Sequence, residues 1–523
     1  MCSIVGLIDR SGRDVSDRLI VMLQSIRHRG PDGAGVLVDG KVRIAEKIAD
    51  VAISEVKGSM GLGSCRLEIT GEKEGIQPLY GCGNKVALVF NGEIYNYREL
   101  AERLSNHRFS TSTDTEVIVH LFEENLKNSD MVTAVRKTMS QLDGMYAFAL
   151  CYNDNIILCR DSLGVKPLYL SEEGAVFAFA SERKALWRIG LTENVTALET
   201  GSFAILSGNS FKKLDNAKIV QQMTQAIPLE DAVEELICLL SKSVEKMTHF
   251  KRIGILFSGG LDSSIIAKIT ETFPAELSLY CAGFQSSKDL SNARRAARIL
   301  GIPLREHVMT LEEVRAELPR ILYAIEDSRL MNVSIAIPIY LATRIAKREG
   351  VKVMLSGQGA DEVFGGYKRY ETIMDERGGD VLQRELWKDV VNIAHNNLQR
   401  DDAASMANSV EVRVPYLDLD FLKYAMQLPP QYKVKKQGSG YIRKYILRLM
   451  ARTLGVPEEL YDTPKTAAQF GSGSMKAVKS IARSETAKKT PANKDYSIEQ
   501  AYLNAIALKA GIPETEVKAI TRR

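Results

Sequence analysis

The chain has 523 residues, which is too long for one ordinary hydrophobic core, so we expect at least two domains. A hydrophobic content of 45% and a charged content of 26% are typical of a soluble globular protein, and no apolar run of about twenty residues indicates a membrane span. With 69 basic against 65 acidic residues, and no basic stretch interleaved with aromatic side chains, nothing indicates nucleic-acid binding.

The seven cysteines are scattered, odd in number and without Cys-x-x-Cys spacing. This pattern favours reduced thiols over a disulfide framework or a zinc site. The chain opens with M-C-S-I-V-G-L-I-D-R, which lacks the pattern of a signal peptide. We therefore expect a cytoplasmic protein without membrane attachment.

Cys2 is the first residue that indicates chemistry. Removal of Met1, which is usual before a small residue, would leave a thiol beside a free α-amino group. An amine with a pKa of about 7.7–8.0 can act as general base for that thiol. The alternative is that Cys2 is a small residue that begins a strand.

The first 208 residues predict many short strands and few helices. Strand-like runs include residues 35–38, 61–65, 86–90 and 143–149, and amphipathic helices begin near residues 16 and 114. This mixture predicts a sandwich of sheets with helices outside. A polar stretch without sustained periodicity follows, and we place the domains at residues 1–208 and 229–523, with a linker at 209–228.

Strand-like and helical runs alternate in the second domain. Short apolar strands are expected at residues 253–257, 277–284 and 351–355, with helices between them. This alternation predicts an α/β fold with a doubly wound parallel sheet.

Two of these strands lead directly into glycine-rich turns. S-G-G-L-D-S-S occupies residues 258–264, and S-G-Q-G-A-D-E occupies residues 356–362. A strand, a glycine-rich turn and a helix N-terminus together form an anion cradle, and parallel sheets bind ligands at such carboxyl ends. Asp262 and Asp361 are candidate ligands of Mg²⁺, which prefers oxygen donors. The alternative for each aspartate is a helix cap.

The N-terminal motifs resemble the class II glutamine amidotransferase domain, an N-terminal nucleophile hydrolase with an α/β/β/α sandwich. The motifs are Cys2, R-H-R-G-P-D-G at 27–33, N-G-E-I-Y-N at 91–96, D-T-E at 114–116 and R-D-x-x-G-x-K-P-L-Y at 160–169. The resemblance implies that Cys2 attacks the side-chain amide of glutamine and releases ammonia. It implies an oxyanion hole at Asn91 and Gly92, and a glutamine pocket that also includes Arg66, Leu67, Glu93 and Asp114.

Simpler interpretations exist for parts of this pattern. Thr113 and Glu116 have the spacing of a helix capping box, and Asn91-Gly92 is also a common hairpin turn. Arg66 could be an ordinary surface arginine. Each interpretation is reasonable alone, but together they do not account for the order of the motifs.

The second domain resembles the ATP pyrophosphatase domain of glutamine-dependent asparagine synthetases. The resemblance rests on the two glycine-rich turns and on R-D-D-A-A-S-M-A-N-S-V-E-V-R-V-P-Y-L-D at 400–418. It implies that aspartate and ATP form β-aspartyl-AMP and pyrophosphate, after which ammonia that has crossed an internal tunnel displaces AMP. The implied cofactors are ATP and Mg²⁺, and the implied small-molecule partners are aspartate, glutamine and ATP. A homodimer is compatible with the sequence, which does not fix the oligomeric state.

The same resemblance assigns the nucleotide site. The implied ATP contacts are Leu256, Ser258, Gly259, Gly260, Asp262, Ser263, Ala282, Ser356 and Gly357, with Asp262 and Asp361 on the metal. Lys465 corresponds to a lysine that steadies phosphate charge, and its alternative is a solvated surface residue.

Gln358 departs from the family pattern, because asparagine synthetases carry glutamate at this catalytic position. A neutral amide cannot accept a proton from incoming ammonium. Glu326, Glu411 and Glu362 are other carboxylates that could do so.

Three further functions remain open. The enzyme could adenylate a carboxylate other than aspartate, or it could cyclise an adenylated acid as β-lactam synthetases do, although Cys2 argues against the latter. A catalytically silent homologue that only binds ligands is opposed by the intact Cys2 and S-G-G-L-D-S-S motifs.

Overall fold

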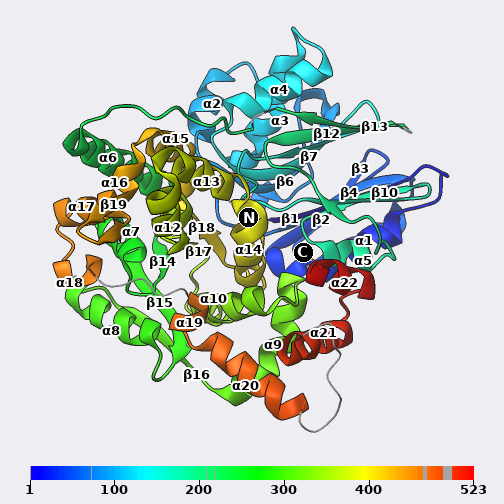
Figure 1. The fold of residues 1–523 in the computed structure, drawn as a ribbon. Coiled ribbons are helices and arrows are strands. Elements are labelled where there is room, and N and C mark those ends of the chain that lie inside the picture. Colours follow the sequence, from blue (N-terminus) through cyan, green and yellow to red (C-terminus); the bar gives the residue numbers. More distant parts are fainter. Residues whose placement is uncertain are drawn as a thin grey trace. The chain divides into compact units, whose positions relative to one another are not determined.

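The computed structural model describes residues 2–71, 73–208, 210–216, 218–462, 468–486 and 497–522. The chain forms two compact units, one of Met1–Ile219 with Ile512–Arg523 and one of Val220–Gly511 (Figure 1). Within the described part of the chain, no helix is both long and apolar enough to span a membrane.

The first unit is built on two antiparallel sheets. The seven-stranded sheet has the order β11-β9-β10-β1-β4-β2-β3, and the six-stranded sheet has the order β13-β12-β8-β7-β6-β5. The strands are β1 (Cys2–Asp9), β2 (Gly33–Val38), β3 (Lys41–Ala45), β4 (Met60–Arg66), β5 (Leu79–Tyr80), β6 (Val86–Ile94), β7 (Gly144–Tyr152), β8 (Asn155–Arg160), β9 (Tyr169–Glu173), β10 (Val176–Ala180), β11 (Thr196–Ala197), β12 (Ser202–Ser207) and β13 (Ser210–Asp215).

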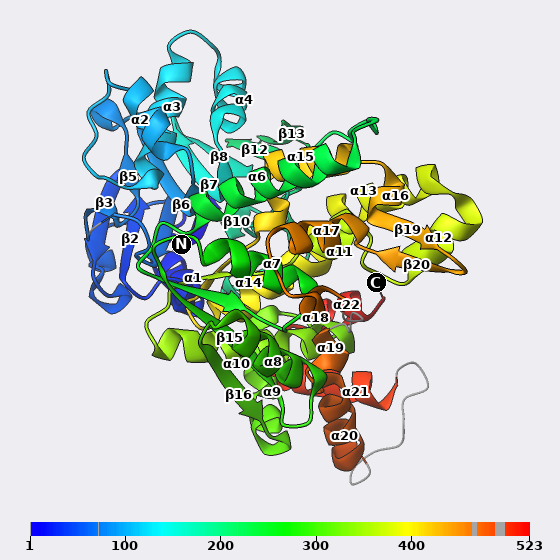
Figure 2. The same ribbon diagram turned by 90° about the vertical axis from the view of Figure 1, so that its left-hand side faces the viewer.

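Helices cover the outer face of each sheet. Helices α1 (Ser16–Ser25) and α5 (Arg183–Trp187) share an apolar cluster with the seven-stranded sheet. Helices α2 (Tyr97–Arg103), α3 (Asp114–Leu126) and α4 (Met131–Gln141) pack on the six-stranded sheet (Figure 2). A third cluster, which includes Ile4, Leu62, Val89 and Ala149, lies between the sheets because side chains alternate along each strand. The predicted α/β/β/α sandwich is confirmed.

The last helix also belongs to the first unit. The domain limits expected from the sequence assign residues 512–523 to the second domain, whereas the structure groups α22 (Glu514–Arg522) with the first. Arg183 of α5 donates a 2.9 Å hydrogen bond to Glu516, and Thr515 donates one of 3.2 Å to the carbonyl of Thr192. These contacts join sequence-distant segments, which local composition does not reveal.

The second unit contains a parallel five-stranded sheet with the order β16-β15-β14-β17-β18. Its strands are β14 (Arg252–Leu256), β15 (Glu276–Phe284), β16 (Leu304–Met309), β17 (Val353–Leu355) and β18 (Glu411–Arg413), and a separate hairpin joins β19 (Val434–Gln437) to β20 (Gly440–Arg443). The strand order reverses between β14 and β17, so the predicted doubly wound sheet is confirmed. This reversal is the position at which such sheets bind ligands.

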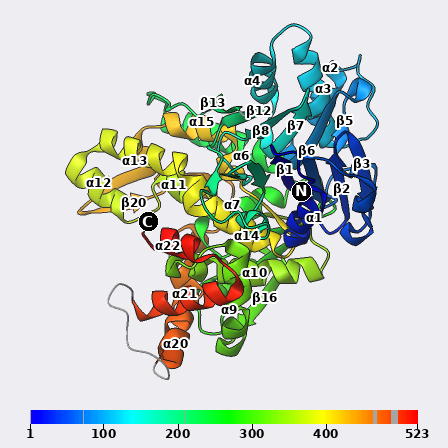
Figure 3. The same ribbon diagram turned by 90° about the vertical axis from the view of Figure 1, so that its right-hand side faces the viewer.

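The helices of the second unit surround this sheet. Helices α8 and α10 pack on β15 (Figure 2). Helix α9 lies beside α10 (Figure 3). The helices are α6 (Leu229–Met247), α7 (Leu261–Thr270), α8 (Lys288–Leu300), α9 (Leu311–Ile325), α10 (Leu330–Arg348), α11 (Ala360–Phe364), α12 (Arg369–Arg377), α13 (Gly379–Val391), α14 (Gln399–Met406), α15 (Leu419–Gln427), α16 (Pro430–Lys433), α17 (Tyr445–Thr453), α18 (Glu458–Tyr461), α19 (Ala468–Gly471), α20 (Ser474–Thr486) and α21 (Ile498–Ala510).

Candidate active sites

Cys2 begins the central strand β1 of the first unit and is buried. In the pairing of β1 with β4 it lies opposite Arg66, and its backbone N–H donates to Oδ1 of Asn91 at 3.3 Å. Burial raises the pKa of the Cys2 thiol above its usual value, while the Leu67 backbone N–H and the Arg66 charge oppose this shift. Met1, whose removal the sequence predicts, lies outside the described residues.

Asn91 and Gly92 lie within strand β6, so they do not form a hairpin turn. They pair with Ala147 and Tyr146 of β7, and Asn91 is fully buried. Its side-chain Nδ2 has no hydrogen-bond partner among the described residues. A buried amide donor without an acceptor is costly, which suits a group that donates to a charge formed during reaction.

The residues expected to bind glutamine lie next to this strand. Asp114 is the first residue of α3, and its carboxylate accepts hydrogen bonds of 2.9 Å from the Ile94 backbone N–H and from the Thr70 hydroxyl. Arg66 ends β4 and donates to the carbonyl of Thr70 at 3.0 Å. Glu93 and Leu67 are buried beside them in the chain. Arg66, Leu67 and Asp114 all lie near enough to Cys2 to act on its thiol, whereas Glu93 is placed only by its position in β6.

The capping-box alternative is not what the structure forms. Thr113 precedes α3 but makes no side-chain cap, and its hydroxyl contacts that of Thr111 at 2.9 Å. Glu116 instead accepts from the backbone N–H groups of Ser110 and Thr111, at 2.7 and 2.6 Å. Asp114 is thus held by Thr70 and Ile94 independently of a capping box.

Sequence reasoning missed Gln77, which contacts the nucleophile. Its side-chain Nε2 lies 3.5 Å from Cys2 Sγ, and its Oε1 accepts from the Phe90 backbone N–H at 2.6 Å. The amide is therefore oriented with its donor toward sulfur. Gln77 belongs to none of the recognised motifs, so only the fold identifies it.

In the second unit, β14 ends in the first glycine-rich turn. Gly259 has φ +71, and a Cβ there would lie 2.5 Å from the Asn292 carbonyl carbon, so a larger residue does not fit. Gly260 is the N-cap of α7, and Ser263 in the first turn donates to its carbonyl at 3.2 Å. The N-terminus of α7 thus follows the carboxyl end of β14 and presents backbone N–H groups of the kind that bind phosphate.

The second glycine-rich turn touches the first. A Cβ on Gly357 would lie 2.9 Å from Cβ of Asp262, so this close approach requires glycine. The Ser356 N–H donates to the Arg413 carbonyl at 2.9 Å, which fixes the turn to β18. Leu256 ends β14, and Ala282 lies near the same end of the adjacent β15. The residues expected to contact ATP therefore gather at one edge of the sheet.

Lys444, which sequence reasoning missed, joins the two candidate metal ligands. Its Nζ lies 2.6 Å from Oδ2 of Asp262 and 2.6 Å from Oδ1 of Asp361. Burial lowers the pKa of Lys444, and the charge of Asp262 opposes this effect. One cation thus contacts both carboxylates, which places the two candidate metal ligands side by side. Lys465 lies outside the described residues and stays a prediction.

The carboxylates that could compensate for Gln358 have different surroundings. Glu411 is fully buried in an ion pair of 2.5 Å with Arg413, and Glu326 ends α9 with φ +55. Glu362 accepts from the Tyr367 hydroxyl at 2.5 Å and from Asn397 at 2.7 Å, and burial raises its pKa. Glu362 also lines a cavity of about 370 Å³ together with Tyr367, Arg369, Asp389, Asn396 and Asn397.

Comparison with known proteins identifies both halves of the chain. A glutamine amidotransferase domain model matches residues 1–224, and an asparagine synthase model matches residues 235–379 and 374–517. A protein of Methanocaldococcus jannaschii assigned as a glutamine-hydrolysing asparagine synthetase is 37% identical over 532 residues, covering 92% of this chain and 96% of that protein. The glutamine-hydrolysing asparagine synthetase 2 of Arabidopsis thaliana is 31% identical over 467 residues, covering 86% and 74%. A solved structure of the allosteric regulatory enzyme of purine biosynthesis aligns with a TM-score of 0.37 at 24% identity, covering 55% of this chain and 66% of that one.

Proposed function

Because the chain belongs to the family of glutamine-hydrolysing asparagine synthetases, we propose that it converts aspartate to asparagine with ATP and with ammonia taken from glutamine. The observation that carries this proposal is the presence of two assembled sites in one chain. Cys2 and Asn91 are in contact in the first unit, and Lys444 links Asp262 to Asp361 in the second.

In the first half-reaction, the Cys2 thiolate attacks the side-chain carbonyl carbon of glutamine. Nδ2 of Asn91 and the Gly92 N–H donate to the oxyanion that forms, because a buried donor is strongest where charge develops. The intermediate collapses to a thioester as ammonia leaves, and water then releases glutamate. The Cys2 α-amino group, once Met1 is removed, carries the thiol proton to the leaving nitrogen.

The α-substituents of glutamine are bound on either side of the nucleophile. Arg66 lies opposite Cys2 in the β1–β4 pair, so its guanidinium pairs with the α-carboxylate. Asp114 and Glu93 supply negative charge for the α-ammonium. Leu67 covers the substrate stem between them.

In the second half-reaction, the side-chain carboxylate of aspartate attacks the α-phosphorus of ATP and pyrophosphate leaves. The Ser258–Ser263 turn and the N-terminus of α7 bind the released phosphates. Asp262 and Asp361 would hold Mg²⁺, which when bound neutralises the phosphate charge. Ammonia then attacks the acyl carbon of β-aspartyl-AMP, and AMP leaves with the bonding electron pair.

Formation of the amide leaves a proton on nitrogen that the Gln358 amide cannot accept. We assign this proton to Glu362, because its Oε2 is buried without a hydrogen-bond partner among the described residues and burial raises the pKa of its carboxyl group, although the Lys444 charge opposes that shift. Gln358 also favours a second candidate function, amidation of a carboxylate other than aspartate. The two functions share all steps except the identity of the acceptor.

Product analysis distinguishes these functions. The full chain is incubated with Mg-ATP, aspartate and glutamine labelled with ¹⁵N at the amide, and products are measured by mass spectrometry. We expect labelled asparagine in equal amounts with AMP and pyrophosphate. Glutamate released without asparagine or AMP would refute the aspartate assignment, and the same assay with other amino-dicarboxylates would then identify the acceptor.

We also propose that the protein is cytoplasmic. The seven cysteines form no disulfide in the structure, which agrees with a reducing, cytoplasmic location. To test the location, protein taken directly from cells is alkylated with and without prior reduction, and the mass added to each cysteine is measured by mass spectrometry. Equal alkylation in both samples is expected for reduced thiols.

A further inference from the structure

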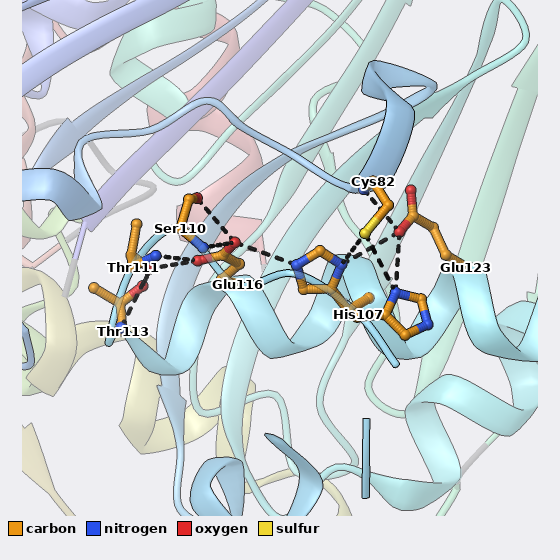
Figure 4. A network of polar contacts seen from close by, with 8 residues as sticks. Cys82, His107, Ser110, Thr111, Thr113, Glu116 and Glu123 are labelled. Carbon is orange, nitrogen blue, oxygen red and sulfur yellow. Dashed lines mark hydrogen bonds and ion pairs between the residues drawn. The ribbon is translucent and has the colours of Figure 1, made fainter. Parts of the chain in front are cut away.

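Four potential metal ligands meet in the first unit, and none of them is among the residues placed around Cys2. Cys82 follows β5, His107 lies between α2 and α3, and His120 and Glu123 lie on α3 (Figure 4). Each offers one donor atom, and all four donor atoms lie within 4.8 Å of one another. None of these residues has a role in either proposed half-reaction.

Four of the six distances between donor atoms are close to those of tetrahedral coordination, and the other two do not exceed 4.8 Å. Zinc bonds of about 2.0–2.3 Å at tetrahedral angles separate neighbouring donors by about 3.3–3.6 Å. Sγ of Cys82 lies 3.7 Å from Nδ1 of both histidines. Oε2 of Glu123 lies 3.3 Å from Nδ1 of His120 and 3.6 Å from Nδ1 of His107. A single ion at the centre would therefore reach all four with small adjustments.

The second nitrogen of each imidazole is held by another carboxylate. Nε2 of His120 lies 3.2 Å from Oε1 of Glu116, and Nε2 of His107 lies 2.9 Å from Oε2 of Glu124. These contacts fix each ring so that Nδ1 points at the common centre. Carboxylates on the far nitrogen of metal-binding histidines are a general feature of zinc sites, where they set the tautomer and raise ligand basicity.

Glu116 is itself anchored, so the orientation of His120 does not depend on a mobile group. Glu116 accepts hydrogen bonds from the backbone and hydroxyl groups of Ser110 and Thr111 at 2.6–2.9 Å (Figure 4). The His120 ring is thus oriented by a carboxylate whose own position is fixed by four hydrogen bonds.

The backbone also makes room for the cluster. The Cys82 N–H donates to Oε2 of Glu123 at 3.0 Å, and a Cβ on Gly81 would lie 2.2 Å from Oε1 of the same carboxylate. Only glycine at position 81 therefore lets Glu123 occupy this position. The His120 side chain is 1% exposed and that of His107 is 5% exposed, while Cys82 is exposed at the surface.

We propose that Cys82, His107, His120 and Glu123 bind one Zn²⁺ in a structural site. One thiolate, two imidazoles and one carboxylate are all donors that zinc accepts, and four protein ligands leave no position for substrate. The ion joins the turn after β5 and the segment between α2 and α3 to helix α3. Asp114 begins that helix, so the zinc site fixes the element that carries a proposed glutamine ligand.

Metal content tests the proposal directly. The full chain is produced without an affinity tag, kept reduced with a phosphine, reconstituted with Zn²⁺ and desalted. Its zinc content is then measured by inductively coupled plasma mass spectrometry. We expect about one zinc per chain in the wild type. The variants Cys82→Ser and His107→Ala should bind zinc at least about a hundredfold more weakly in competition with a chromophoric chelator.

Two matched variants control for loss of any exposed thiol or imidazole. Cys238→Ser and His249→Ala change exposed residues of the second unit and should leave zinc binding unchanged. Circular dichroism checks that all four variants fold, and Cys82→Ser, at an exposed position, is the variant least expected to disturb the fold. Zinc at a hundredfold excess over its Kd should raise the Tm of the first unit by about 5–10 °C in the wild type and the controls, but not in Cys82→Ser.

The visible spectrum of the protein with Co²⁺ in place of Zn²⁺ tests whether Cys82 is a ligand. Co²⁺ in this site should show the intense visible absorption of four-coordinate cobalt together with a thiolate charge-transfer band, and the latter should disappear in Cys82→Ser. A wild-type chain that holds no more zinc than Cys82→Ser after reconstitution overturns the proposal, because the cluster is then a set of histidine–carboxylate ion pairs. Stoichiometric binding of another metal in preference to zinc overturns the choice of ion. Neither outcome depends on whether the chain makes asparagine.

Discussion

The two candidate active sites are positioned by different kinds of structure. Around Cys2, strand register does most of the positioning, because Cys2 lies opposite Arg66 and Asn91 sits inside β6. Around Asp262, the positioning comes from two glycine-rich turns that touch at the carboxyl edge of a parallel sheet. The first site presents a buried donor, Asn91 Nδ2, without an acceptor among the described residues, whereas in the second Lys444 contacts both carboxylates.

This difference fits the chemistry proposed for each site. A nucleophile and an oxyanion hole need fixed distances, which hydrogen-bonded strands supply. A site for nucleotide and metal must accommodate phosphate charge beside its own carboxylates, and a buried lysine in contact with both carboxylates suits that chemistry. The comparison predicts that the two sites fail independently.

Replacement of Cys2 should give the largest effect. Cys2→Ala removes the nucleophile, so glutamine-dependent synthesis should fall by about 10⁴-fold or more. Ammonia-dependent synthesis, measured with ammonium chloride as the nitrogen source, should remain within about twofold of the wild type. Cys238→Ser, at an exposed position, controls for thiol loss. Equal loss of both activities would show that the sites are not independent.

Replacement of Lys444 should give the reverse pattern. Lys444→Met removes the cation between Asp262 and Asp361, and we expect aspartate-dependent ATP–pyrophosphate exchange to fall by about 10³-fold. Glutaminase activity should be retained, which also shows that the chain is folded. Lys435→Met, at an exposed position in β19, is the matched control. Unchanged exchange in Lys444→Met would remove Lys444 from the proposed site.

Replacement of Asn91 should impair only glutamine hydrolysis at the first site, and by less than replacement of Cys2. Asn91→Ala deletes one of two oxyanion donors, so kcat for glutamine hydrolysis should fall by about 10²–10³-fold with little change in KM. Asn91→Asp keeps the size but replaces the Nδ2 donor, and should be at least as impaired. A rise in KM at constant kcat would instead indicate a role in substrate binding.

The smallest effect concerns the stability of the second unit. Burial lowers the pKa of Lys433 to about 7, so above pH 7 the folded chain holds a neutral amine while the unfolded chain stays protonated up to about pH 10. Because the unfolded state binds more protons in this window, the free energy of unfolding should rise with pH from about 7 to 10 and be lowest below pH 7. Lys433→Met should remove this rise and stabilise the unit by about 2–4 kcal/mol at pH 7.

The two tryptophans make it possible to measure the unfolding of the second unit in the whole chain. Trp187 lies in the first unit and Trp387 in the second, so Trp187→Phe leaves a fluorescence reporter on α13. Denaturant unfolding at several pH values then compares Lys433→Met with Lys423→Met, an exposed control. Identical pH dependence in the two variants would contradict the effect of burial on Lys433.

The amino-acid sequence was sufficient for the family and for the fold of both units. Glycine-rich turns, strand periodicity and Cys2 are local patterns, so each can be recognised within a short stretch of sequence. The strands at β2, β4 and β14 lie where apolar runs predicted them. The roles of individual site residues stay predictions until the variants above are measured.

Other features were decided only when distant segments came together. Gln77 and Lys444 carry no motif, because their partners Cys2, Asp262 and Asp361 are far along the chain. The zinc ligands are spread over residues 82–123, so cysteine spacing alone argued against such a site. The contacts of Arg183 with Glu516 likewise place the last helix with the first unit. Metal sites and charge networks depend on distances between side chains, and only tertiary packing sets those distances.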